Sequence, residues 1–138
     1  MHPAISQTCT MPSSLEEDFA AYGDAGAEAV ELWLTKVEDY LETHSVGELL
    51  DLASSRGLEF AAGGVQGGIL FSQGEVRQAA WDLLERRLQL CSILKIPTLV
   101  VVPDLIVAAP KANIGQSDIE RGQISARRAA ELAAQFNV

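Results

Sequence analysis

Cysteine is scarce in this chain of 138 residues, which contains only Cys9 and Cys91. Neither belongs to a CxxC pair or to another spacing typical of metal ligands. No spacing supports a disulfide either, so we expect two reduced thiols, as in a protein of the reducing cytoplasm. We predict no metal site in this chain alone.

Positive charge is also sparse. The chain contains ten Lys and Arg residues and 19 Asp and Glu residues. Its formal net charge is therefore -9, and its pI is near 4.6. Nucleic-acid binding draws most of its non-specific affinity from basic side chains on phosphates, so we exclude a nucleic-acid partner. The two basic pairs, Arg86-Arg87 and Arg127-Arg128, are interpreted as solvated helix faces.

Long apolar runs are absent as well. The longest mostly apolar stretch, residues 96–110, is interrupted by Pro97, Pro103 and Asp104 and is too short to cross a bilayer. The first ten residues lack a basic start followed by an apolar segment, so we expect no signal peptide. The sequence therefore predicts a soluble, cytoplasmic protein without a membrane partner.

The sequence does contain four short apolar segments that alternate with helical ones. The strands are predicted at residues 4–10, 29–33, 58–62 and 98–102. Capping-box spacings predict three helix starts, at Ser14 with Glu17, Ser45 with Glu48, and Ser117 with Glu120. Gly26 is placed to end the first helix in a left-handed turn. The longest helix is predicted over residues 74–95, with Val76 among its buried positions. This β-α alternation predicts an α/β domain over residues 1–138 with parallel strands.

Three observations favour half of a TIM (β/α)8 barrel over a small open sheet. The turn after the first strand has no glycine, which excludes the GxGxxG dinucleotide motif there. In the second strand Glu31 and Trp33 alternate with apolar neighbours, so both side chains are expected to face the interior of a barrel. The alternative interpretation of Glu31 is a structural ion pair with a Lys or Arg from another strand. Finally, eight units need about 250 residues, and four units account for roughly half.

Half a barrel leaves the first and fourth strands with unpaired edges. The fourth strand carries no charge that would deter pairing. We therefore expect self-association through these edges.

Several segments together resemble the sugar phosphate isomerase/epimerase family, the xylose isomerase-like TIM barrels. Thr8-Cys9-Thr10 and SSLEEDFAAYGDAGAEAVELW are similar to the opening of these proteins, with Ala25-Gly26-Ala27 before the Val30-Glu31-Leu32-Trp33 strand. GELLDLASSRGLEFAAGG, WDLLERRLQLCSILKIPTLVVVPD and ARRAAELAAQFNV are similar to the later elements. The resemblance covers the whole chain as a pattern of elements and implies the N-terminal half of such a barrel.

The resemblance implies a metal-dependent isomerase or epimerase acting on a sugar, sugar phosphate or related polyol. In this family a divalent ion (Mn, Mg, Co or Zn) is held by two Glu, an Asp and a His on strands five to eight, beyond this half. The catalytic residues are therefore unknown here, and the isolated chain is expected to be inactive. The substrate-binding candidates at strand ends are Cys9, Thr10, Glu31, Trp33, Gly63, Gly64, Gln66 and Asp104.

Two alternatives remain open at this point. A dehydratase or lyase of the same superfamily would use the same half. A non-catalytic half-barrel that self-associates would use its edges instead. A DNA-repair endonuclease of this superfamily is disfavoured, because it would need histidines at the ends of strands three and four. His2 and His44 are both expected at the surface.

Overall fold

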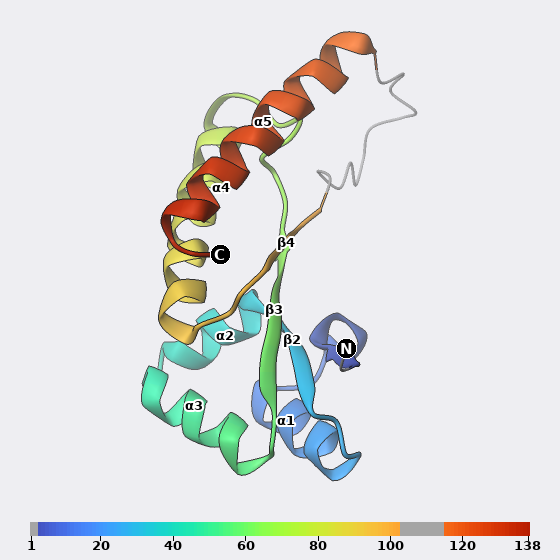
Figure 1. Ribbon diagram of the computed structural model, residues 1–138, viewed down its shortest axis with the longest axis vertical. Coiled ribbons are helices and arrows are strands. Elements are labelled where there is room, and N and C mark those ends of the chain that lie inside the picture. Colours follow the sequence, from blue (N-terminus) through green and yellow to red (C-terminus); the bar gives the residue numbers. More distant parts are fainter. Residues whose placement is uncertain (1–2, 103–114) are drawn as a thin grey trace.

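The computed structural model describes residues 3–102 and 115–138, and contains four strands separated by helices (Figure 1). The elements are β1 (Ala4–Ser6), the 3-10 helix η1 (Gln7–Thr10), α1 (Leu15–Asp24), β2 (Ala29–Trp33), α2 (Leu34–Leu41), α3 (Val46–Ser55), β3 (Glu59–Gln66), α4 (Gly74–Leu94), β4 (Leu99–Val101) and α5 (Gln116–Gln135). The predicted alternation of strands and helices is confirmed. The candidate Asp104 and its neighbour Pro103 lie outside the described residues.

The four strands form one parallel sheet in the order β1-β2-β3-β4. Each strand pairs with its neighbours in the sequence, as in successive units of a (β/α)8 barrel. The long strand β3 joins the two halves of the sheet, because Phe60 pairs with Val30 of β2 while Gln66 pairs with Val101 of β4. The predicted half-barrel topology is therefore present.

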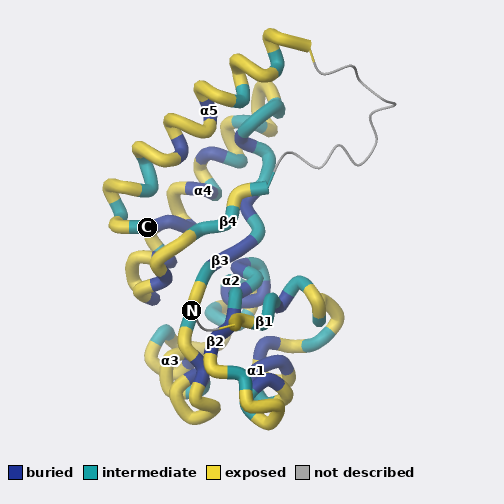
Figure 2. The backbone as a smooth tube through the Cα atoms, turned by 45° about the vertical axis from the view of Figure 1, so that its right-hand side comes forward, coloured by how far each residue is buried: buried dark blue, intermediate teal, exposed yellow. Residues whose placement is uncertain are grey.

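Helices pack against one face of this sheet (Figures 1 and 2). Val30 and Leu32 of β2 are completely buried in the core on that side, together with Phe19 of α1. Glu31 and Trp33 alternate with them and remain partly exposed. Because successive strand side chains point to opposite faces, these two lie on the face that the helices leave open.

Local sequence signals explain where several helices begin and end. The capping boxes at Ser14 with Glu17 and at Ser45 with Glu48 are both formed. Gly26 adopts φ +76, the left-handed conformation that glycine reaches without steric cost, as predicted. The third predicted box is wrong: α5 begins two residues earlier, with Gly115 in place of Ser117 at its N-cap, and the Gly115 N–H donates to the Asp118 carboxylate at 2.9 Å.

Two strand boundaries also differ from the prediction. The segment predicted as strand 4–10 is extended only to Ser6, whose side chain caps η1 by accepting from the Thr8 N–H. The third strand does not stop at Ala62 but continues through Gly63 and Gly64 to Gln66. Pairing with both neighbouring strands holds these residues extended, since Gly64 is the register partner of Trp33 in β2 and Gly63 is that of Leu99 in β4.

The helix α4 departs from the expected pattern at two positions. Val76 is 69% exposed rather than buried. Arg87 is only 5% exposed, which corrects its interpretation as part of a solvated face. Its guanidinium donates to both carboxylate oxygens of Glu38, to the Thr35 hydroxyl and to the Val65 carbonyl, so its charge is fully compensated inside the fold.

Both arginines of the second basic pair are exposed, as interpreted from the sequence, and Arg128 also makes a contact with α4. Arg128 is exposed, yet its guanidinium lies 4.2 Å from the centre of the buried Trp81 ring. Such a cation-π contact joins α5 to α4. Within residues 3–102 and 115–138, no helix combines the length and the apolar character that crossing a membrane requires.

Candidate functional site

Glu31 is the carboxylate that the sheet presents on its open face. It is half-buried near the carboxyl end of β2, and Ser6, its register partner on β1, donates from Oγ to Oε1 at 2.7 Å. The alternative interpretation of Glu31 from the sequence was an ion pair with a basic residue. Glu31 forms no such pair among the described residues. A hydroxyl therefore orients the carboxylate, and no basic side chain in the described part of the chain pairs with it.

Gly64 and Gly63 lie beside Glu31 but face opposite sides of the sheet. A Cβ on Gly64 would lie 3.4 Å from Glu31 Oε1, so this glycine leaves room at the carboxylate. A Cβ on Gly63 would lie 3.2 Å from Leu34 Cδ2 and 3.3 Å from Cys91 Sγ, so this glycine lets the core approach β3. Of the two candidates, Gly64 belongs to the open face and Gly63 to the core side.

Gln66 is not brought to the open face. Its side chain is 1% exposed, and its amide nitrogen donates to the carbonyls of Gly67 and Ala80. Arg87 reaches its amide oxygen at 3.5 Å. Gln66 therefore connects β3 to α4, and both polar atoms of its side chain already have hydrogen-bond partners within the fold.

Cys9 and Thr10 lie in η1, just after β1. Cys9 is exposed. Thr10 shares a hydrogen bond of 2.5 Å with the Tyr22 hydroxyl, and its carbonyl accepts from Lys36 Nζ at 2.8 Å. Burial raises the pKa of the Tyr22 hydroxyl, against a smaller lowering by the Thr10 hydrogen bond, so this hydroxyl stays protonated at neutral pH. Thr10 therefore secures η1 to α1 and α2.

A buried polar network lies beneath η1, and sequence reasoning missed it. Lys36 Nζ lies 2.6 Å from Asp18 Oδ2, which also accepts from Gln7 Nε2 at 2.9 Å. The side-chain amide oxygen Oε1 of Gln7 in turn accepts from the Trp33 backbone N–H at 3.0 Å. One sequence signal could have revealed it, because Asp18 lies on the same helical stripe as Leu15, Phe19 and Tyr22.

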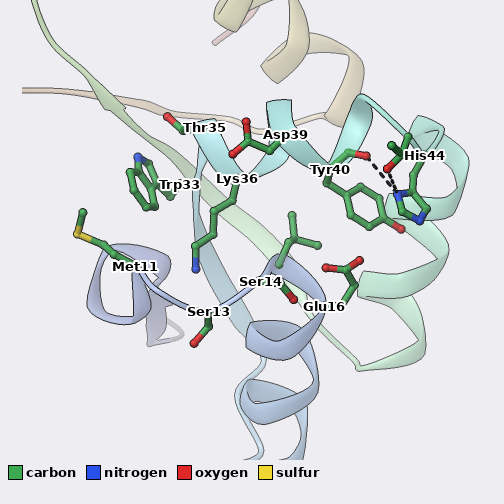
Figure 3. Close-up of a pocket in the computed structure, with 12 residues that line it drawn as sticks. Met11, Ser13, Ser14, Glu16, Trp33, Thr35, Lys36, Asp39, Tyr40 and His44 are labelled. Atoms are coloured by element: carbon green, nitrogen blue, oxygen red, sulfur yellow. Dashed lines mark hydrogen bonds between the residues drawn. The ribbon is translucent and has the colours of Figure 1, made fainter.

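This network positions Trp33. The residue ends β2 and directly precedes α2, so its backbone cannot move without disturbing Gln7. The ring lies next to Met11 at one end of a pocket between α2 and the segment leading into α1 (Figure 3). Trp33 is thus the one strand-end candidate in the described chain that lines this pocket.

The pocket has a volume of about 470 Å³ and a mixed lining. Figure 3 shows the Lys36 side chain crossing it towards Ser13, with Tyr40 and His44 at the far end. The Tyr40 and His44 rings are stacked with centres 4.1 Å apart, and His44 is exposed as predicted. The lining residues are Met11, Ser13, Ser14, Leu15, Glu16, Trp33, Thr35, Lys36, Asp39, Tyr40, Thr43 and His44.

The residues present do not fit a metal ion. Among residues 3–102 and 115–138, no group of three His, Cys, Asp or Glu side chains converges closely enough to hold one. Glu31 is a single carboxylate beside a serine and a glycine. Divalent ions in proteins require several such ligands, so the part of this half that the structure describes offers hydrogen bonding and charge rather than a metal centre.

The fold of this chain recurs in solved protein structures. The IolI protein, in a crystal structure with a zinc atom, matches with a TM-score of 0.77 and 17% identity over 100% of this chain and 49% of its own. The chain has the fold of half a xylose isomerase-like TIM barrel. The half-barrel predicted from the sequence is thereby confirmed.

Two further structures show the same half-barrel. The probable 3-DHS dehydratase AsbF of Bacillus anthracis matches with a TM-score of 0.78 and 18% identity over 100% of this chain and 50% of its own. A D-psicose 3-epimerase determined with D-fructose matches with a TM-score of 0.73 and 17% identity, over the same shares. No family profile and no curated protein matches the sequence. The chain spans about half the length of these three structures.

Proposed function

We propose that this half-barrel supplies the substrate-facing wall of a sugar or sugar-phosphate isomerase or epimerase. The reaction of the complete barrel would be a metal-assisted transfer of a proton next to a carbonyl. The observation that carries the proposal is Glu31, whose charge is held on the open face by Ser6. Support also comes from the fold, which is shared with an epimerase crystallised with D-fructose.

The geometry suits recognition of hydroxyl groups. Ser6 engages Oε1 of Glu31, so Oε2 remains able to accept a hydrogen bond from a sugar hydroxyl. Gly64 adds no side chain beside this carboxylate, so a hydroxyl has room to approach. Trp33 follows two residues later on the same strand face, and its ring offers an apolar surface for the carbon face of a sugar. Cys9, which follows β1, remains a candidate at the same end of the strands, and Asp104 remains a candidate from the sequence alone.

The divalent ion belongs to the part of the barrel outside this half. IolI was crystallised with zinc, which supports a metal in the complete protein. The described residues here provide no site for it, so we assign this half no step that involves the metal. Its contribution is binding and orientation, which place the reacting carbon without moving a proton themselves.

Two glutamates at opposite ends of the sheet allow a controlled test. Glu31 lies near the carboxyl end of β2, whereas Glu59 begins β3 and is exposed. We would titrate the isotope-labelled chain with D-fructose and follow backbone and indole NMR signals. We expect shifts at Glu31 and Trp33 with a millimolar Kd, as befits a few hydrogen bonds.

The substitution Glu31→Gln should weaken this binding about tenfold, because a hydrogen bond to a charged group contributes about 1.5 kcal/mol or more. Glu59→Gln should leave it unchanged. Shifts confined to residues remote from β1 and β2, or equal binding by both variants, would contradict the proposal.

A dehydratase or lyase is the second candidate, favoured by the match to AsbF. The same wall would then orient a polyol that loses water. Assaying the longer parent protein for released water or an unsaturated product, rather than for an epimer, separates the two reactions. We further propose a cytoplasmic location, where both free thiols would stay reduced.

A further inference from the structure

The pocket beside Trp33 contains polar side chains that the fold does not use. Ser13 Oγ and the carboxylates of Glu16 and Asp39 line it, and within residues 3–102 and 115–138 none of the three has a hydrogen bond or an ion pair. We infer that this pocket is a subsite for a second, uncharged sugar unit. The substrate of the complete barrel is then a glycoside larger than a monosaccharide. This inference rests on the proposed function and names the substrate class for it.

Trp33 joins the pocket to the open face of the sheet. Its side chain lies on the same face of β2 as Glu31, about 7 Å further along the strand. Its ring borders the pocket next to Met11 (Figure 3). A first sugar unit at Glu31 would therefore have the pocket directly beyond the tryptophan. A second unit linked to the first is placed to enter that pocket, whereas a single unit leaves it empty.

The size and the lining of the pocket suit a sugar ring. Its volume of about 470 Å³ lies within the range of about 300–1,000 Å³ that is usual for small-molecule sites. At the end far from Trp33, Tyr40 is half-buried, and its stacking on His44 with ring planes 9° apart fixes the orientation of its ring. Aromatic rings offer apolar surface to the carbon face of a sugar, and the free polar groups between them can bind its hydroxyls.

The charges around the pocket favour an uncharged unit over a phosphate. Lys36 is the one lysine or arginine in the lining, and its charge is compensated by Asp18 at 2.6 Å. The Thr10 carbonyl accepts a second hydrogen bond from Lys36 Nζ, so one of the three N–H groups is left to donate to a sugar oxygen. Glu16 and Asp39 add two negative charges, which would repel an anion.

Linked sugars that contain fructose provide the test. Turanose, maltulose and isomaltulose each carry a glucose unit on a different hydroxyl of fructose. We would titrate the isotope-labelled chain with each of them and with D-fructose, and follow the NMR signals. We expect at least one disaccharide to bind about tenfold more tightly than D-fructose, through the added hydrogen bonds. It should also shift signals of Ser13, Asp39 and Tyr40 that D-fructose leaves in place.

Two exposed aspartates provide a matched pair of variants. Asp39→Asn removes a free carboxylate of the pocket and should reduce the ratio of the D-fructose Kd to the disaccharide Kd from about ten to about two. Asp51→Asn makes the same change on α3, outside the pocket, and should leave both Kd values unchanged. Inorganic phosphate is the anionic probe and should leave the signals of Lys36 and Ser13 in place.

The outcomes separate the subsite from the proposed function. Disaccharides that bind no more tightly than D-fructose, with shifts confined to Glu31 and Trp33, would overturn the subsite and leave the proposed function standing. A lack of D-fructose shifts at Glu31 would instead count against the proposed function. Equal effects of Asp39→Asn and Asp51→Asn, or phosphate-induced shifts at Lys36 and Ser13, would also overturn the subsite.

Discussion

Lys36 and Asp18 form an ion pair of 2.6 Å in which both side chains are almost completely buried, at 8% and 1% exposure. The pair links α2 to α1 and fixes Gln7, which in turn holds the start of α2 through the Trp33 N–H. The position of the strand-end tryptophan therefore depends on a charge pair inside the fold.

We predict that Asp18→Asn lowers the free energy of unfolding by ~3–5 kcal/mol, because it leaves the Lys36 charge buried without its partner. Asp24 provides the control, since its pair with Arg56 spans 3.6 Å and is largely exposed. Asp24→Asn should change stability by less than ~1 kcal/mol. Urea unfolding measures both, and equal losses would contradict the role assigned to the buried pair.

Arg87 and Arg86 are neighbours on α4 with opposite environments. Arg87→Gln removes hydrogen bonds to Glu38, Thr35 and the Val65 carbonyl, so we expect a loss of ~2–4 kcal/mol. Arg86 is exposed, and Arg86→Gln should stay within ~0.5 kcal/mol of wild type. Thermal or urea unfolding distinguishes the two variants. An Arg87→Gln variant that is as stable as wild type would refute the structural role of this side chain.

The close approach of the core to β3 predicts a difference between two glycines. Gly63→Ala should destabilise the chain by ~1–3 kcal/mol, because the new methyl group meets Leu34 and Cys91 at 3.2 and 3.3 Å. At Gly67 the nearest atom, Val102 Cγ2, would be at 3.6 Å, an ordinary contact. Gly67→Ala should therefore leave stability unchanged or raise it by up to ~1 kcal/mol, since it restricts the unfolded chain. If urea unfolding showed Gly67→Ala to be less stable than Gly63→Ala, this packing would be ruled out.

Alkaline pH should weaken the fold through Cys91. Burial raises the pKa of this thiol from 9.0 to about 11, against a smaller lowering by Arg87. The folded state therefore keeps a proton that the unfolded state releases. This stabilising contribution is fully present below pH 9 and is lost as the pH rises through 11. Denaturant unfolding across this window should show a steeper decline for wild type than for Cys91→Ala, whereas Cys9→Ala should keep the wild-type slope.

Much of the fold could be predicted because its signals are local. The capping serines mark two helix starts, and the alternation of Val30 and Leu32 with Glu31 and Trp33 assigns the two faces of β2. These features depend only on neighbouring residues and on strand periodicity.

The parts that could not be predicted depend on residues distant in the sequence. Gly63 and Gly64 resemble a loop until Leu99 of β4 pairs with Gly63 and Trp33 of β2 pairs with Gly64. Arg87 looks solvated until Glu38, 49 positions earlier, is folded against it. Gln66 was expected at a ligand site, yet its side-chain amide donates a hydrogen bond to a backbone carbonyl of α4. In each case a tertiary partner overrides the local pattern.

At Gly63 and Gly64 the sheet is a single layer of backbone with no side chain on either face. The Cys91 sulfur and Leu34 lie against one side of it, and the Glu31 carboxylate against the other. A change in the packing of Cys91 or Leu34 would therefore shift the β3 backbone and, with it, the position of the Glu31 carboxylate on the other side. Substitutions that enlarge the core at Cys91 would displace Glu31 without touching it.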